Sequence, residues 1–181
     1  GGRWRRALGL VHAMRSQAVR TGTIASNAAI SACAGGLQWE KAPQLLKQVQ
    51  RTSARPSLVT YNAAISTIGS GLQWKQAWDL FHTLKCCGME ADAISHSATI
   101  HACASVLLWE FAIDLLGRVR MEAPPEARIT PLNAAISACD AGRQWQLALT
   151  WLLSAHASRW ADAVTLNAGL SSCARAGRWP Y

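Results

Sequence analysis

The chain has 181 residues, of which 50% are hydrophobic and 15% charged, and its formal net charge is +8. This composition excludes a disordered chain, which would have few apolar residues and many charges, and no apolar run approaches the roughly 20 residues of a membrane-spanning helix. The excess charge lies in residues 1–60, which hold nine Lys or Arg and one acid, so this end either binds a polyanion such as nucleic acid or is a solvated surface.

The first predicted element is a helix over residues 3–22, because its apolar residues recur at the i, i+3, i+4 and i+7 spacing of a helix. Residues 23–57 then predict two helices, at about 24–34 and 38–51, separated by the pair Gly35-Gly36. Ser57 closes this segment at a position where it can cap the next helix.

The same helix pair is predicted again along the rest of the chain, because two markers recur at a nearly fixed interval. IASNAAIS (24–31) returns as VTYNAAIS at 59, ISHSATIH at 94, TPLNAAIS at 130 and VTLNAGLS at 164, and a Trp recurs six times from Trp4 to Trp179 at intervals of 34 to 36 residues. Such a period is typical of a repeat array in which each unit buries its apolar face against its neighbours. The sequence therefore predicts an all-α fold, an α-solenoid of antiparallel helix pairs with a period of about 35 residues.

The two markers also set the predicted domain boundaries. Whole repeats are expected at 23–57, 58–92, 93–128 and 129–162, with a partial repeat holding a second helix at 1–22 and another partial repeat at 163–181. Because the chain opens without Met in the second half of a unit and stops inside another, we expect it to be a piece of a longer array.

Cysteine and histidine spacing predicts neither a metal site nor a cofactor. Cys occupies one equivalent place in four units, as Cys33, Cys103, Cys139 and Cys173, and Ile68 fills that place in the remaining one. A place shared by Cys and Ile is a buried apolar site, so we expect structural thiols in a reducing compartment. The adjacent Cys86 and Cys87 and the five scattered histidines lack ligand spacing. The few acids form no catalytic motif either, so no enzyme activity is predicted.

A polar residue recurs inside each predicted first helix, and its recurrence there is not explained by helix propensity. These residues are Asn27, Asn62, Ser97, Asn133 and Asn167. An Asn amide offers a donor and an acceptor, as the edge of a nucleobase requires; a ladder of amides between neighbouring helices is the structural alternative. The recurring Trp could stack on bases, but its place beside a fixed Ala in each second helix favours core packing.

Taken together, these features resemble the pentatricopeptide repeat family over essentially the whole chain. The most specific parts are VTYN (59–62), the 35-residue period, the fixed Ala and the closing turns Ala-Arg-Pro-Ser and Glu-Ala-Asp. Tetratricopeptide repeats have a similar period, but their opening motif is absent. The family implies a solenoid that binds single-stranded RNA, commonly in plastids or mitochondria.

In that family the fifth and last residues of each unit read one base. Carried onto this sequence, the pairs are Asn27 with Ser57, Asn62 with Asp92, Ser97 with Arg128, and Asn133 with Asp162, followed by Asn167. The resemblance implies pyrimidine, uracil, purine and uracil in that order, although Arg128 fits none of the family's pairings. The second residues would sandwich the bases; they are Ile24, Val59, Ile94, Thr130 and Val164. Asp92 and Asp162 stand equally well as helix N-caps.

The resemblance therefore implies sequence-specific binding of single-stranded RNA that guides RNA processing, stability, editing or translation in a chloroplast or mitochondrion. Partners would be single-stranded RNA and other RNA-processing proteins, with no membrane and no metal. The thirteenth place of the unit, where the family often has a phosphate-binding Lys, is basic only at Arg175, so phosphate contacts should be few. The alternative is a protein-interaction scaffold of the same helical-repeat fold.

Overall fold

The computed structural model describes residues 23–35, 38–51, 56–122, 124–157, 161–175 and 177, together with Arg5, Arg6, Gly9 and Ala13. Those last four residues are helical; the rest of the predicted helix 3–22, and Trp179, lie outside the described residues. Every regular element in the described part of the chain is a helix. The chain divides into two compact units, residues 1–91 and 92–181.

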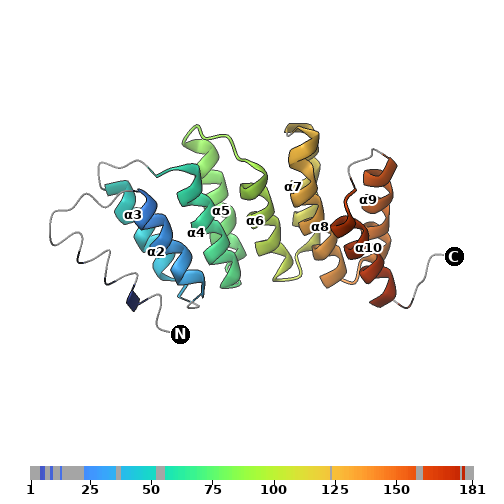
Figure 1. The fold of residues 1–181 in the computed structure, drawn as a ribbon, viewed down its shortest axis with the longest axis horizontal. Helices are drawn as coiled ribbons and strands as arrows, with labels where there is room; N and C mark the ends of the chain where they lie inside the picture. The colour runs from blue at the N-terminus through green and yellow to red at the C-terminus, as the bar shows by residue number, and fades with distance from the viewer. Residues whose placement is uncertain are drawn as a thin grey trace. The chain divides into compact units, whose positions relative to one another are not determined.

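The first unit holds two helix pairs, drawn from blue to green in Figure 1. They are α2 (Thr23–Gly35) with α3 (Lys41–Arg51), and α4 (Leu58–Ser70) with α5 (Trp74–Cys86). The first helices of the two pairs, α2 and α4, lie side by side, and α3 contacts both of them. Each second helix thus packs on the first helix of its own pair, and α3 also packs on that of the next pair.

The second unit is built from the same kind of helix pair, and its described residues include three first helices. Its elements are α6 (Ala93–Ala104), α7 (Trp109–Glu122), the short 3-10 helix η1 (Pro125–Arg128), α8 (Ile129–Ala141), α9 (Trp145–Ala157) and α10 (Ala163–Arg175). α8 lies between α6 and α10, while α7 contacts α6 and α8, and α9 contacts α8 and α10. The predicted all-α fold of stacked helix pairs is confirmed.

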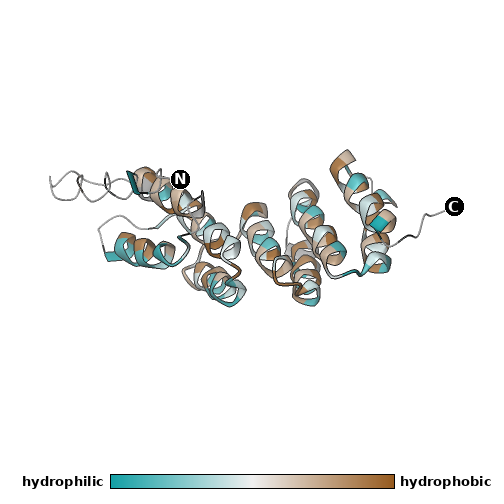
Figure 2. Cartoon of the chain, turned by 90° about the horizontal axis from the view of Figure 1, so that it is seen from below, coloured by the Kyte–Doolittle hydropathy of each residue, from teal (hydrophilic) through white to brown (hydrophobic). Residues whose placement is uncertain are grey.

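The core of each pair is built from the small and aliphatic residues that recur in the sequence. The fixed Ala of the second helices is fully buried in every described copy; the residues are Ala42, Ala77, Ala112 and Ala148. Apolar and polar residues are interspersed along the helices (Figure 2), and they separate most clearly into a core side and a solvent side in α3, where Ala42, Leu46 and Val49 are buried. None of the helices in the described ranges combines the length and the hydropathy needed to cross a membrane.

The four equivalent cysteines are free thiols that belong to this core. Cys33, Cys103, Cys139 and Cys173 are buried, and burial raises the pKa of Cys103 and of Cys139 to about 11, so both remain protonated at neutral pH. The predicted structural thiols are confirmed. Cys86 ends α5 and Cys87 follows it in a turn, and both are exposed.

The recurring Trp packs on the backbone of the next repeat. A Cβ built on Gly71 would lie 2.2 Å from Cγ of Trp39, and one built on Gly142 would lie 2.4 Å from Cδ1 of Trp109. These two indoles therefore occupy space that only glycine leaves free. Both indoles are half-buried, so they pack between consecutive repeats at the edge of the core.

Two glycines that follow first helices do not have the left-handed conformation for which glycine is often found at a helix C-terminus. Gly71 and Gly142 follow α4 and α8 with φ of −86° and −78°, which any residue can adopt. The left-handed conformation falls one residue later, on Leu72 (φ 60°) and Arg143 (φ 56°). Glycine is required here by the Trp contact and not by the helix C-cap.

Two further expectations differ from the structure in detail. The second helix expected from residue 38 begins at Lys41, and Trp39 lies in the preceding turn. The extra residue of the third repeat suggests a turn at Pro124-Pro125, but Pro125 begins η1, which runs directly into α8. Proline suits the first turn of a helix, because its missing N–H would have no helical partner there.

Candidate nucleic-acid interface

In each compact unit the first helices have a solvent-facing side, formed by the second, fifth, ninth and thirteenth residues of each repeat. Residues spaced at i, i+3, i+7 and i+11 lie on one face of an α-helix, and we call this surface the first-helix face. Its ninth positions are exposed and small or polar: Ser31, Ser66, His101, Ser137 and Ser171. Among its described residues Arg175 is the single fixed charge. This surface therefore offers a partner mainly polar and apolar groups, with few charges.

The second positions place aliphatic side chains in solvent, where they bury little surface and so contribute little to folding. Exposed fractions are 83% for Ile24, 61% for Val59, 62% for Ile94 and 60% for Val164; Thr130 is exposed as well. A regular series of exposed apolar residues is typical of a binding surface. The residues predicted to sandwich bases are thus accessible to a ligand in both compact units.

The fifth positions are less accessible than the second positions in most repeats. Asn62 is 8% exposed, Asn27, Ser97 and Asn133 are half-buried, and Asn167 is exposed. Oδ1 of Asn27 is buried and has no hydrogen-bond partner among the described residues. A ladder built of Asn side chains alone does not describe these contacts, since Asn133 bonds to a Thr of the next first helix.

Three of the four predicted last residues cap the helix that follows them. The Ser57 side chain accepts from Thr60 N–H and forms a capping box at α4. Asp92 accepts from Ser95 N–H at α6 (2.8 Å), and Asp162 accepts from Thr165 N–H at α10 (2.7 Å). The predicted N-caps are confirmed. Arg128 differs, because it ends η1 in a helical conformation and makes no side-chain cap bond to α8.

Asn133 and Asp162, one of the predicted base-reading pairs, meet at Thr165. The Thr165 Oγ1 lies 2.6 Å from Oδ1 of Asn133 and 2.6 Å from Oδ1 of Asp162. The fifth residue of one repeat, its last residue and the third residue of the next repeat thus form one hydrogen-bonded cluster. Asn62 and Asp92 belong to different compact units, so no contact is described for that pair.

The cluster keeps the Asp162 carboxyl ionised. Side-chain and backbone hydrogen bonds from Thr165 lower the pKa of Asp162 below its ordinary value of 3.8, with a smaller contribution from a side-chain hydrogen bond donated by Asn133. A carboxylate with this pKa is a permanent hydrogen-bond acceptor at neutral pH. It offers the N–H of a base an acceptor beside the Asn133 amide.

Removing the Thr165 hydroxyl should raise the pKa of Asp162. In Thr165→Val, the carboxylate loses its largest favourable contact, so the midpoint of an NMR titration of its carboxyl carbon should move up toward 3.8. Because the folded-state pKa is depressed, the stabilisation by this cluster is present above the unfolded-state pKa and is lost as the pH falls through the folded-state value. An unchanged midpoint would show that the backbone bonds alone depress the pKa.

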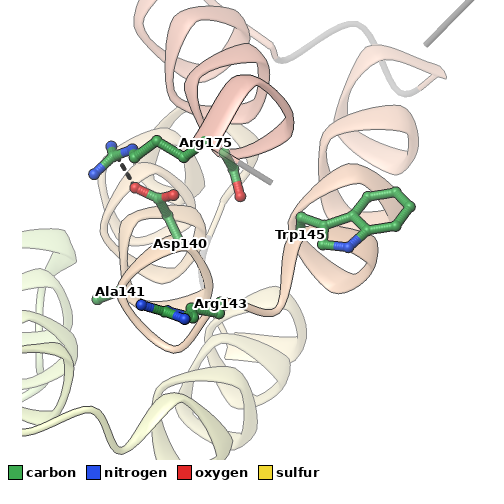
Figure 3. A pocket seen from close by; sticks show the side chains of 6 residues that line it. Asp140, Ala141, Arg143, Trp145 and Arg175 are labelled. Carbon is green, nitrogen blue, oxygen red and sulfur yellow. Dashed lines mark ion pairs between the residues drawn. The ribbon is translucent and has the colours of Figure 1, made fainter. Parts of the chain in front are cut away.

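A separate cavity of about 620 Å³ lies in the second unit, at the C-terminal ends of α8 and α10 (Figure 3). Its lining residues are Asp140, Ala141, Arg143, Trp145, Ser172 and Arg175. Arg175 forms an ion pair with Asp140 here, drawn as a dashed line in the figure. The single basic residue of the first-helix face therefore has part of its charge neutralised, which further limits attraction for phosphate.

Sequence reasoning missed Thr165 and the ninth-position serines. Thr165 is a third residue, and its contact with Asn133 spans 32 positions, so no local pattern marks it. The serines stand within the recurring NAAIS segment, and their place four residues beyond the polar marker was the available signal.

These features define the chain as a helical-repeat protein of the α-solenoid class. No protein-family model and no curated protein matches the sequence. Among solved structures, the fold is similar to the pentatricopeptide repeat protein PPR10 in complex with an 18-nt psaJ RNA element (TM-score 0.74, 24% identity, 87% of this chain and 23% of that one). It is also similar to PPR10 from maize (TM-score 0.71, 20% identity, 100% of this chain and 28% of that one).

The chain thus has the fold of pentatricopeptide repeat proteins. It spans about a quarter of the length of the solved proteins that it matches.

Proposed function

We propose that this chain binds single-stranded RNA on its first-helix face, with one base opposite each repeat. The fold supports this proposal, because similar helical repeats are found in a protein crystallised with RNA. The chemistry of the face supports it as well. Exposed aliphatic side chains can pack against base planes, and amides and hydroxyls can bond to base edges, while the near absence of charge disfavours binding by phosphate contacts alone.

The observation that carries the proposal is the cluster in which the Thr165 hydroxyl joins Asn133 to Asp162. The oxygen of the Asn133 amide is bonded to Thr165, so its N–H groups can donate to a keto oxygen of a base. Asp162 supplies a carboxylate acceptor at the same place. Uracil presents an N–H beside keto oxygens, and an adjacent donor and acceptor complement that edge. Asn133 with Asp162 therefore fits uracil.

The finer assignment extends this argument to the other repeats. The order is pyrimidine at Asn27 with Ser57, uracil at Asn62 with Asp92, purine at Ser97 with Arg128, and uracil at Asn133 with Asp162, followed by a base at Asn167. The exposed second residues would separate consecutive bases. The chain would act by binding, without chemistry of its own, and would guide processing, stability, editing or translation of an RNA in a chloroplast or mitochondrion.

Fluorescence anisotropy with short RNAs tests this function. We expect single-stranded RNAs with the core CUAUU or CUGUU to bind more tightly than RNAs with the same bases in permuted order. Asn133→Ala should weaken binding about five-fold or more and relax the preference at the fourth base, because it removes a base-reading hydrogen bond.

The salt dependence supplies a second criterion. With so few basic side chains on the first-helix face, log K should fall only shallowly with log salt, by a slope of about −0.7 to −1.4, as expected for one or two phosphate contacts to a single strand. A steep slope without sequence preference would contradict base reading and indicate binding by the basic N-terminal end. No binding to any of these RNAs would favour a protein-interaction scaffold.

A further inference from the structure

Thr165 joins the two predicted base-reading residues through a hydroxyl that is itself inaccessible to RNA. Its side chain has an exposed fraction of 0%, and it belongs to α10, whereas Asn133 belongs to α8. The two first helices pack side by side. The hydroxyl therefore acts from inside the interface between consecutive repeats, behind the first-helix face.

The Thr165 hydroxyl lies within hydrogen-bond distance of two acceptors, Oδ1 of Asp162 and Oδ1 of Asn133. Asp162 also accepts the backbone N–H of Thr165. Oδ1 of Asn133 has Thr165 as its hydrogen-bond donor at 2.6 Å. The hydrogen bond from Thr165 satisfies the amide oxygen of Asn133. Rotation that exchanges the amide oxygen and nitrogen would break this bond.

The equivalent residues of the first whole repeat show what happens without this arrangement. There, the third residue of the next repeat is Thr60, and its hydroxyl lies 3.1 Å from the Ser57 hydroxyl and accepts the Ser57 backbone N–H at 3.1 Å. Oδ1 of Asn27 is left buried without a hydrogen-bond partner among the described residues. The hydrogen bond from the Thr of the next repeat to the Asn oxygen is thus present between Thr165 and Asn133 and absent at Asn27.

We propose that Thr165 is a positioning residue that fixes the orientation of the Asn133 amide and thereby sets the discrimination between uracil and cytosine at this repeat. This inference rests on the proposed function. A fixed amide presents its N–H to a keto oxygen of uracil. Cytosine has an amino group there, so a donor would face a donor. An amide free to rotate can present its oxygen instead and accept cytosine.

The test compares the affinities of the chain for CUAUU and CUACU RNAs, which differ at the base opposite Asn133. Thr165→Val keeps the shape of the side chain but removes the hydroxyl, and Thr165→Ser restores the hydroxyl. We expect the wild type and Thr165→Ser to prefer uracil, and Thr165→Val to lose about five-fold in the ratio of the two affinities, the effect of one hydrogen bond. A ratio that Thr165→Val leaves unchanged would overturn the inference.

Thr99→Val is the matched control, because Thr99 is also buried and its hydroxyl donates within its own helix, to the Ser95 carbonyl (2.8 Å). This variant should keep the wild-type ratio. A loss of the ratio in both valine variants would point to general loosening of the helices and count against the inference.

A measurement on the free protein separates this inference from the proposed function. Exchange of the Asn133 side-chain amide protons with water, followed by NMR, should be slow in the wild type and in Thr165→Ser, and faster in Thr165→Val. Equal exchange in all variants would overturn the positioning role even if RNA binds selectively. If exchange changes as expected but the wild type does not distinguish the two RNAs, base reading by Asn133 fails together with the consequence drawn for specificity.

Discussion

Replacement of the four exposed aliphatic second residues by serine should weaken binding to CUAUU RNA by about 100-fold or more. The substitutions are Ile24→Ser, Val59→Ser, Ile94→Ser and Val164→Ser. Burying each side chain between bases should contribute about 1 kcal/mol, somewhat less than full burial of such a side chain. Each loss raises the dissociation constant about five-fold, and independent losses at four distant sites multiply to several hundred-fold. Titration by fluorescence anisotropy measures the effect.

The same quadruple variant should fold as well as the wild type. All four side chains are at least 60% exposed, and substitutions at exposed sites usually change stability by less than about 0.5 kcal/mol each. Leu153→Ser is the matched control: Leu153 is also 60% exposed but lies on α9, a second helix. Equal losses of affinity in the control and in the quadruple variant would refute the first-helix face as the binding surface.

Alanine at Gly142 should lower the stability of the fold, whereas alanine at Gly117 should raise it. The new Cβ at Gly142 would lie 2.4 Å from Cδ1 of Trp109, so the indole must move out of its site, at a cost of about 1–3 kcal/mol. Gly117 lies inside α7 with nothing within 4 Å of a new Cβ. Alanine there should stabilise the helix by roughly 0.5–1 kcal/mol.

Urea unfolding followed by far-UV circular dichroism tests the pair of variants. The expected midpoints lie on opposite sides of that of the wild type. Gly71→Ala, against Trp39 at 2.2 Å, should behave like Gly142→Ala. A destabilisation of similar size by Gly117→Ala would show that glycine is needed for backbone freedom at all these sites and would contradict the role given to the indoles.

The helical scaffold was predictable because its signals are local. The period of the markers places first helices near 23, 58, 93, 129 and 163, and α2, α4, α6, α8 and α10 begin at those residues. Ser57 and Asp92 were predicted as caps from their position alone, and they accept the bonds expected of caps. Helical spacing and capping need only a few neighbouring residues, which a single sequence contains.

The contacts between repeats were not predictable in the same way. Trp39 and Gly71 are each visible as recurring residues, but nothing in the sequence states that one fills the space left by the other. Asn133 and Asp162 were named as a pair through a family resemblance, whereas Thr165, which holds them, was not. Such contacts depend on the angle and distance between helices, and these are properties of the packed structure.

The indole–glycine contact has a consequence for engineering this scaffold. Trp39 and Gly71 belong to different sequence repeats, as do Trp109 and Gly142, yet each pair must be compatible in size. The segments 39–71 and 109–142, each a second helix followed by a first helix, are therefore the modules to transplant. A graft cut at the ends of sequence repeats would separate each indole from its matching glycine, whereas a graft offset by about half a repeat would carry both.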